Sequence, residues 1–340
     1  MTTARAELTP QMLAYEEKFD DRGHIRWLPY LMYFHATDHR STVVNTDRLG
    51  FRISHGATQT ASVGGRLPDG PVRLLAGSST VFGIGATNDA ATLSSRLWSC
   101  HAPALPWLNF GGRSYNSAQE LLLFVLYRHL LPRISEIVLF SGFNNLGLSR
   151  LPAHQRGDHG AFFNCGDFFA QMQQLRPKNG PLRGIFRRGG QQPVEPPVEA
   201  TVPELTEQIT LATELTIRHL ETWQVFAAAI GARLTFVLQP LATWVRDRPA
   251  PQERRLFEEL DSIASFGQVY GDIASGEAGR QYAKALRLRC QPIGVRFFDF
   301  APALAEAVGP TDWLFVDRIH FTDEGHDLAA RVLAGMLEVG

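Results

Sequence analysis

Four side chains in this sequence have the types that acyl transfer requires: Ser79, Asn144, Asp317 and His320. A serine hydroxyl becomes an effective nucleophile when a histidine takes its proton, and the histidine needs a carboxylate to fix its tautomer. An aspartate three residues before a histidine can reach the imidazole within one tight turn. An asparagine amide and backbone N–H groups near the serine can then hold the developing oxyanion. These residue types predict serine-dependent chemistry if the fold brings them together.

The elements that must position these residues follow an alternating pattern. Short apolar runs predict five buried strands, and helix-length amphipathic segments lie between and after them. The runs are 72–76, 106–110, 136–140, 233–238 and 295–300, and the helices are 90–100, 117–131, 203–230, 276–291 and 323–338. Right-handed crossovers place such helices on both faces of a parallel sheet. The pattern predicts a three-layer α/β/α, flavodoxin-like domain with a central parallel sheet of about five strands.

The candidate residues follow the predicted strands directly. In an open parallel sheet, ligands bind beyond the carboxyl ends of the strands. Ser79 follows the first strand, Asn144 follows the third, and the apolar run 313–316 leads into Asp317 and His320. We therefore expect these side chains to converge on one rim of the sheet.

Four separated blocks between Gly77 and Ala330 resemble the SGNH (GDSL-like) hydrolase superfamily. The blocks are Gly77-Ser78-Ser79 with Gly83, Asn109 to Ser114, Gly142 to Asn145, and Asp317 to His320. The resemblance implies a catalytic set of Ser79, His320 and Asp317. It also implies an oxyanion hole made by the backbone N–H groups of Ser79 and Ser114 and the side-chain amide of Asn144.

Three positions depart from the pattern of that family. Ser78 stands where an aspartate is usual before the nucleophile, and Asn145 stands where an aspartate usually follows the oxyanion asparagine. Ser114 stands where the oxyanion-hole glycine is usual. A serine keeps the N–H donor but lacks the freedom of glycine at positive φ. We expect this change to affect substrate fit rather than to abolish activity.

Structural roles are the alternatives for each residue taken alone. Ser79 could cap the helix that follows its strand, and Asn144 could be a turn residue. His320 could be a loop histidine bonded to Asp317 for local structure. His326, inside the last predicted helix, is interpreted as a surface or packing residue.

Other motifs are weak, so we expect neither a metal nor an organic cofactor. The Gly83-Ile84-Gly85 segment lacks the third glycine of a dinucleotide loop, and no Gly-x-Ser-x-Gly elbow occurs. Ligand-type residues gather at His154, Asp158, His159 and Cys165, but their spacing matches no common zinc site.

Composition is that of an ordinary globular protein. The 340 residues carry a formal charge of −1, and the three cysteines lie far apart, which favours a reducing compartment. No apolar stretch approaches the length of a membrane span. We expect a cytoplasmic protein that binds neither nucleic acid nor a membrane, and the oligomeric state stays open.

Arginine outnumbers lysine strongly, since only three of the 33 basic residues are lysines. Coding bias explains most of this excess. Arg113, beside the oxyanion block, and Arg318, between the catalytic Asp and His, are the two candidates for binding an anionic substrate group. An ion pair with a surface acid is the alternative for each.

Two segments do not fit the alternating pattern. Residues 1–70 contain one candidate helix, at 10–18, and are predicted to form an arm packed on a catalytic domain at 71–340. Residues 150–202 are rich in Gly, Pro, Gln and Arg, and they form either a lid or a loose insert.

The leading functional hypothesis is a serine-dependent acyl hydrolase of esterase type, acting through an acyl-enzyme on an ester of a small molecule or carbohydrate. The first alternative is an acyltransferase that uses the same serine, histidine and aspartate. The second is a catalytically silent binding protein that keeps the fold.

Overall fold

The computed structural model describes residues 3–19, 26–28, 30–151, 153, 156–163, 202–263 and 266–339. The predicted insert at 150–202 falls mostly outside these residues, as do His154 and Cys165. Within the described part of the chain, no cluster of three or more histidine, cysteine or carboxylate side chains is arranged to hold a metal ion.

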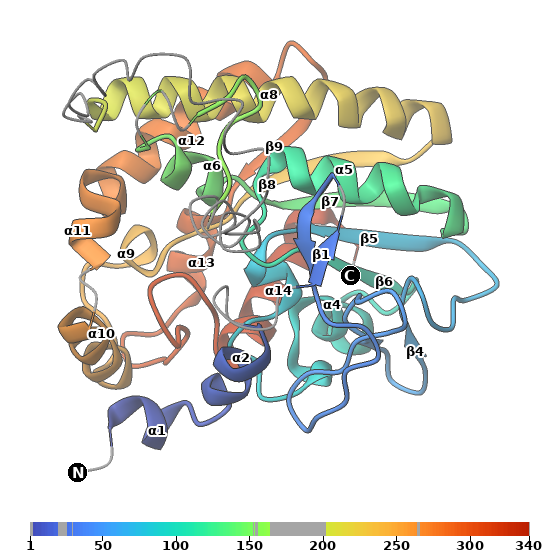
Figure 1. The fold of residues 1–340 in the computed structure, drawn as a ribbon, viewed down its shortest axis with the longest axis horizontal. Helices are drawn as coiled ribbons and strands as arrows, with labels where there is room; N and C mark the ends of the chain where they lie inside the picture. The colour runs from blue at the N-terminus through green and yellow to red at the C-terminus, as the bar shows by residue number, and fades with distance from the viewer. Residues whose placement is uncertain are drawn as a thin grey trace, which may run out of the picture.

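A five-stranded parallel sheet lies at the centre of the molecule (Figure 1). Its strands are β5 (Val72–Gly77), β6 (Trp107–Gly111), β7 (Ile134–Ser141), β8 (Arg233–Leu238) and β9 (Arg296–Asp299). They lie in the order β6-β5-β7-β8-β9, and each neighbouring pair is parallel. This is the 2-1-3-4-5 order of flavodoxin-like sheets, which place a ligand crevice where the order reverses, beside β5. The five predicted strands are confirmed.

Helices cover both faces of the sheet, which confirms the three-layer prediction (Figure 1). One layer holds α5 (Ser117–Tyr127), α8 (Leu205–Ile230) and α12 (Gly276–Cys290), and the other holds α4 (Leu93–Arg96), α13 (Phe300–Ala307) and α14 (Asp323–Leu337). Because both faces are covered, every residue of β5 is buried. None of the helices described is long and apolar enough to cross a bilayer.

Some local structure differs from the prediction. The helix expected at 90–100 is a 3-10 turn (Asp89–Ala91), the short α4, and a π-helical turn (Leu97–His101). Several helices were not predicted, among them α6 (Phe143–Leu148), α9 (Ala242–Val245), α10 (Pro251–Ile263), α11 (Phe266–Tyr270) and α13. α6 is short and begins at the carboxyl end of a strand, where the sequence signals a turn as strongly as a helix.

The first 70 residues hold more regular structure than the single helix predicted. They form α1 (Ala4–Leu8), α2 (Met12–Phe19) and two antiparallel hairpins, of which the first joins β1 (Arg26–Leu28) to β2 (Met32–Phe34) and the second joins β3 (Ser54–His55) to β4 (Thr60–Ala61). These strands have two or three residues each, which is too short for a clear alternating pattern.

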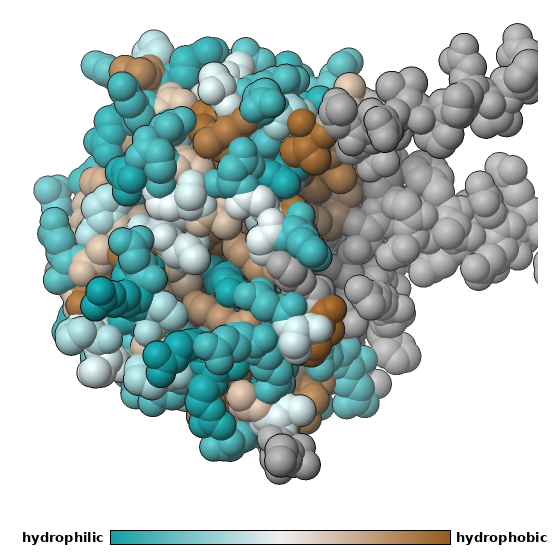
Figure 2. Space-filling view, turned by 90° about the vertical axis from the view of Figure 1, so that its left-hand side faces the viewer, coloured by the Kyte–Doolittle hydropathy of each residue, from teal (hydrophilic) through white to brown (hydrophobic). Residues whose placement is uncertain are grey.

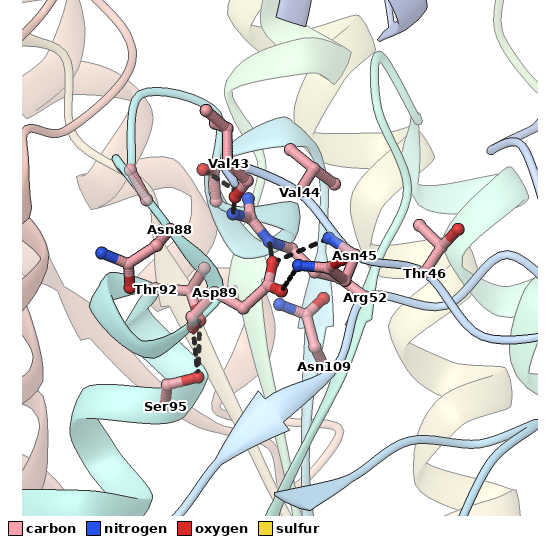
Figure 3. Close-up of polar contacts among 12 residues, drawn as sticks. Val43, Val44, Asn45, Thr46, Arg52, Asn88, Asp89, Thr92, Ser95 and Asn109 are labelled. Atoms are coloured by element: carbon pink, nitrogen blue, oxygen red, sulfur yellow. Dashed lines mark hydrogen bonds and ion pairs between the residues drawn. The ribbon is translucent and has the colours of Figure 1, made fainter. Parts of the chain in front are cut away.

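A buried arginine joins this arm to the helix that follows β5, α3 (Ser79–Phe82). Arg52 donates to Asp89 Oδ1 at 2.8 Å and to the carbonyl oxygen of Gly83, just after α3, at 2.8 Å. Asn45 reaches the same carboxylate through its backbone N–H and its side-chain amide (Figure 3). A buried ion pair persists only when its remaining polar atoms are also satisfied, as they are here. The arm therefore contacts the backbone at the end of α3, the helix that begins at Ser79.

Candidate active site

Ser79, His320 and Asp317 form a continuous chain of hydrogen bonds. Ser79 Oγ lies 2.7 Å from His320 Nε2, and His320 Nδ1 lies 2.7 Å from Asp317 Oδ2. A carboxylate only accepts hydrogen bonds, so Nδ1 carries the ring proton and Nε2 accepts from the serine hydroxyl. This is the tautomer that a general base for Ser79 requires.

The backbone around Ser79 places its hydroxyl at the end of the sheet. Ser79 is the first residue of α3, directly beyond β5. A Cβ atom at Gly77 would lie 2.2 Å from the carbonyl oxygen of Phe140 on the neighbouring strand, so this tight exit from β5 requires glycine. Ser78 occupies the N-cap position without a capping side-chain bond and donates instead to Gln239 Oε1 at 3.2 Å. The Ser79 hydroxyl itself bonds His320, so helix capping does not describe it.

Asp317 is fixed by its own turn. Its Oδ1 accepts the backbone N–H groups of Ile319 at 2.7 Å and His320 at 2.8 Å, while Oδ2 faces the imidazole. Burial raises the pKa of Asp317, but the electrostatic interaction with the His320 ring and these hydrogen bonds outweigh it and hold the pKa below its usual value. The carboxylate therefore stays ionised beside His320.

The loop that carries His320 is held on both sides. The Val316 N–H donates to the His320 carbonyl oxygen at 3.0 Å and closes the turn. Before the turn, Glu253 Oε1 accepts the N–H groups of Leu314 and Phe315 at 3.0 and 3.1 Å. After it, Thr322 caps α14 by accepting from the Gly325 N–H. The histidine is thus presented from a loop anchored to two helices.

Ser114 lies in a tight turn at the end of β6. The Tyr115 N–H donates to the Gly112 carbonyl oxygen at 3.1 Å, and the Gly112 N–H donates to the Gly77 carbonyl oxygen at 2.9 Å. Ser114 has φ +57°, a left-handed conformation at the third position of the turn. Type II turns require this conformation at that position and take glycine there. The Gly112–Tyr115 turn, which is bonded to β5, therefore favours glycine at the position that Ser114 occupies.

Asn144 lies on α6 and faces the same turn. Its Nδ2 donates to the Tyr115 carbonyl oxygen at 2.7 Å, and because Nδ2 carries two hydrogens, one remains for another acceptor. Asn145 accepts the Ser117 N–H and donates to the Ser117 hydroxyl, which locks α6 against α5. Because Asn144 lies within α6, it is a helical residue, and the alternative that it is a turn residue is wrong.

The two arginine candidates have different surroundings. Arg318 donates to both carboxylate oxygens of Asp261, at 3.0 and 2.6 Å, and its guanidinium lies over the rings of Phe257 and Phe266. Of the two roles considered for Arg318, binding a substrate anion or forming an ion pair with an acid, the structure has the ion pair. Arg113 is the second residue of the Ser114 turn and is buried, and its backbone N–H donates to His35 Nε2 at 3.1 Å.

His326 is a packing residue and not a surface residue. Its ring is fully buried and lies edge-on to Phe321, with 5.5 Å between centroids. Burial lowers the pKa of His326 to about 3, so its imidazole is neutral.

Sequence reasoning missed the contacts that the arm makes with the turn at Arg113 and Ser114. Tyr33 and His35 contact Ser114 and Arg113 across 81 and 78 positions of sequence. No local pattern signals contacts at such separations.

The strands point their carboxyl ends toward the left of Figure 1, and Figure 2 looks onto that side of the molecule. The coloured residues there are mostly hydrophilic, with small hydrophobic groups between them (Figure 2).

No protein-family model matches this sequence, and no curated protein matches it. Among solved structures, the chain is similar to Est24, a carbohydrate acetylesterase from Sinorhizobium meliloti, at 11% identity and a TM-score of 0.42, covering 79% of this chain and 98% of that one. It is similar to a member of the lipolytic G-D-S-L family from Veillonella parvula at 11% identity and a TM-score of 0.41, covering 79% and 98%. It is also similar to a lipase/acylhydrolase from Enterococcus faecalis at 11% identity and a TM-score of 0.42, covering 79% and 95%. GDSL-type enzymes, the group that the four sequence blocks resemble, are thus among the solved structures similar to this chain.

Proposed function

We propose that this protein is a serine-dependent acyl hydrolase of esterase type, acting on an ester of a small molecule or carbohydrate. The observation that carries the proposal is the unbroken chain from Ser79 Oγ through His320 to Asp317, with both links at 2.7 Å. If His320 only stabilised its loop, its bond to Asp317 through Nδ1 would suffice. The bond between Nε2 and the Ser79 hydroxyl supports a catalytic role.

The first half of the reaction forms an acyl-enzyme. Ser79 Oγ attacks the ester carbonyl carbon as its proton passes to His320 Nε2, and Asp317 stabilises the resulting imidazolium. When the bond to the alcohol breaks, the same Nε2–H protonates the leaving oxygen.

The second half repeats the chemistry with water. His320 takes a proton from water, whose oxygen attacks the acyl carbon. The bond to Ser79 Oγ then breaks, and the serine recovers its proton from His320. These steps use only the protein's own residues and water.

The oxyanion of each tetrahedral intermediate needs fixed donors. We assign this role to the backbone N–H groups of Ser79 and Ser114 and to the second amide hydrogen of Asn144. The supporting observation is that the three segments that carry these donors are bonded to one another: the Gly112 N–H donates to the Gly77 carbonyl oxygen, and Asn144 Nδ2 donates to the Tyr115 carbonyl oxygen. Donors held in advance cost no reorganisation during the reaction.

Fluorophosphonate labelling tests the assignment. We expect the wild-type protein to be labelled at Ser79 and Ser79→Ala to be unlabelled. Ser78→Ala is the matched control, because it removes a hydroxyl one residue away that bonds Gln239 and not His320. A wild-type protein that resists the reagent, or a Ser79→Ala variant labelled as fast as wild type, contradicts the proposal.

A further inference from the structure

We infer that Tyr33 and His35, from the N-terminal arm, are positioning residues for the oxyanion turn Gly112–Tyr115. The inference rests on the proposed function, because it assigns a role within the same site. It makes the arm part of the catalytic apparatus and not only a cover for the sheet.

The turn needs support because of Ser114. A side chain in the left-handed region is strained, and only glycine adopts it freely. Strained residues persist where the surrounding structure fixes them more strongly than the strain opposes. The contacts of the two peptide groups that flank the Arg113–Ser114 peptide show what fixes it.

Tyr33 holds the peptide group that follows Ser114. Its hydroxyl donates to the Ser114 carbonyl oxygen at 3.2 Å, and the Tyr115 hydroxyl donates back to the Tyr33 carbonyl oxygen at 2.5 Å. The two rings meet edge to face, with 5.7 Å between centroids. Each tyrosine therefore bonds the backbone of the other's segment, and β2 is joined to the turn at two points.

His35 holds the peptide group that precedes the one carrying the Ser114 N–H. Its Nε2 accepts the Arg113 N–H at 3.1 Å, while Nδ1 donates to the Gly50 carbonyl oxygen at 3.1 Å. The ring packs on Phe82, at the end of the nucleophile helix, with 3.8 Å between centroids. Burial, with the charge of Arg113, holds the pKa of His35 well below its usual value, so Nε2 stays an acceptor.

The direction of the Ser114 N–H follows from these two contacts. That N–H belongs to the peptide between Arg113 and Ser114, and the arm anchors the peptide groups on both sides of it. A donor that points away from the oxyanion loses most of its effect, because oxyanion stabilisation depends on placing the hydrogen before the charge develops. His35 also contacts Phe82, so one side chain sets the turn relative to the helix that begins at Ser79.

The kinetic test uses p-nitrophenyl acetate as the substrate and compares the same substitution in the wild-type protein and in a Ser114→Gly variant. We expect Tyr33→Phe to lower kcat about tenfold with KM changed less than about twofold, since misplacing one donor costs part of the effect of removing it. In a Ser114→Gly background the turn forms without strain, and the same substitution should lower kcat less than about threefold. Tyr30→Phe is the matched control, because that hydroxyl belongs to an arm tyrosine that is 79% exposed. An equal loss in both backgrounds, or a loss of thermal stability without a loss of kcat, overturns the inference.

Two further measurements separate positioning from folding. His35→Gln keeps an acceptor for the Arg113 N–H and should retain more of kcat than His35→Leu. Hydrogen exchange at the Arg113 and Tyr115 amides should speed up in Tyr33→Phe and His35→Leu and not in Tyr30→Phe. Unchanged exchange at both amides contradicts the inference whatever the activity.

The labelling experiment distinguishes the two possible failures. If fluorophosphonate does not label wild-type Ser79, the proposed function fails and this inference fails with it. If Ser79 is labelled and Tyr33→Phe leaves kcat unchanged, only the positioning role fails.

Discussion

His320 Nε2 lies 2.7 Å from Ser79 Oγ, although 241 positions separate the two residues in the sequence. The serine comes from the exit of the first sheet strand, and the histidine comes from the loop before the last helix. Both loops lie at the carboxyl ends of the strands, where an open parallel sheet places its ligands. The contact therefore depends on the whole sheet being assembled.

Asp317→Asn should lower kcat by about 10²–10⁴-fold with little change in KM. The asparagine oxygen can still accept the backbone N–H groups of the turn, so the loop keeps its shape. Its amide would donate to His320 Nδ1, however, and force the proton onto Nε2, which could then no longer accept from Ser79. Steady-state kinetics on p-nitrophenyl acetate checks this prediction, and a variant within about threefold of wild type would exclude Asp317 from the reaction.

Ser114→Gly should raise the free energy of unfolding by about 1 kcal/mol, because glycine adopts φ +57° without the strain that a side chain brings. Part of the gain is lost because glycine also has more freedom in the unfolded chain. Urea denaturation measures the change. A destabilised variant would mean that the serine hydroxyl contributes more than the strain costs.

Glu120→Gln should remove a loss of stability that the wild-type protein undergoes between pH 5 and pH 9. Burial raises the pKa of Glu120 to about 8, and the Ser141 hydroxyl donates to it at 2.6 Å. Its folded pKa lies above its unfolded value near 4.5, so the stabilisation is complete below pH 4.5 and is lost as the pH rises through 8.

The wild-type protein should therefore lose roughly 3–5 kcal/mol between pH 5 and pH 9 through this group, and Glu120→Gln should lose none of that. Urea titrations of both proteins at the two pH values provide the comparison. Parallel losses in both proteins would show that Glu120 ionises without cost in the folded state.

Arg318→Met should change the ratio of kcat/KM between an anionic and a neutral ester by less than about twofold. The guanidinium is committed to Asp261 in a two-point ion pair and is not available to a substrate anion. A matched pair of p-nitrophenyl esters, one with a terminal carboxylate, gives the ratio. A selective loss on the anionic ester would restore Arg318 as a substrate-binding residue.

The sheet was predictable because its strands are buried on both faces and read as apolar runs bounded by turn residues. β7 and β8 are clear examples, with runs of six and five buried residues. The hairpin β1–β2 was not predictable, because three-residue strands show no period and depend on contacts made elsewhere. The same holds for α6, whose start at Gly142 reads as a turn.

The candidate residues were predictable for a similar reason: Asp317 and His320 lie within one turn, and Ser79 directly follows a strand. The contacts that hold these residues in place were not predictable. Tyr33, His35 and Arg52 each contact residues that are distant in the sequence, namely Ser114, Arg113 and Asp89, and their own neighbours in sequence carry no sign of it. Folding a second segment against the site creates these contacts, and sequence periodicity describes only one segment at a time.

Trapping of an acyl-enzyme on Ser79 is the most direct test of the roles assigned to Ser79 and His320. Wild-type protein, His320→Ala and Ser79→Ala would each be mixed with p-nitrophenyl acetate, quenched in acid and digested, and mass spectrometry would identify the acetylated peptide. We expect an acetyl group on Ser79 in the wild-type protein, formed much more slowly in His320→Ala and absent from Ser79→Ala. Acetylation at another residue, or release of p-nitrophenol at an equal rate from wild type and Ser79→Ala, would contradict these roles.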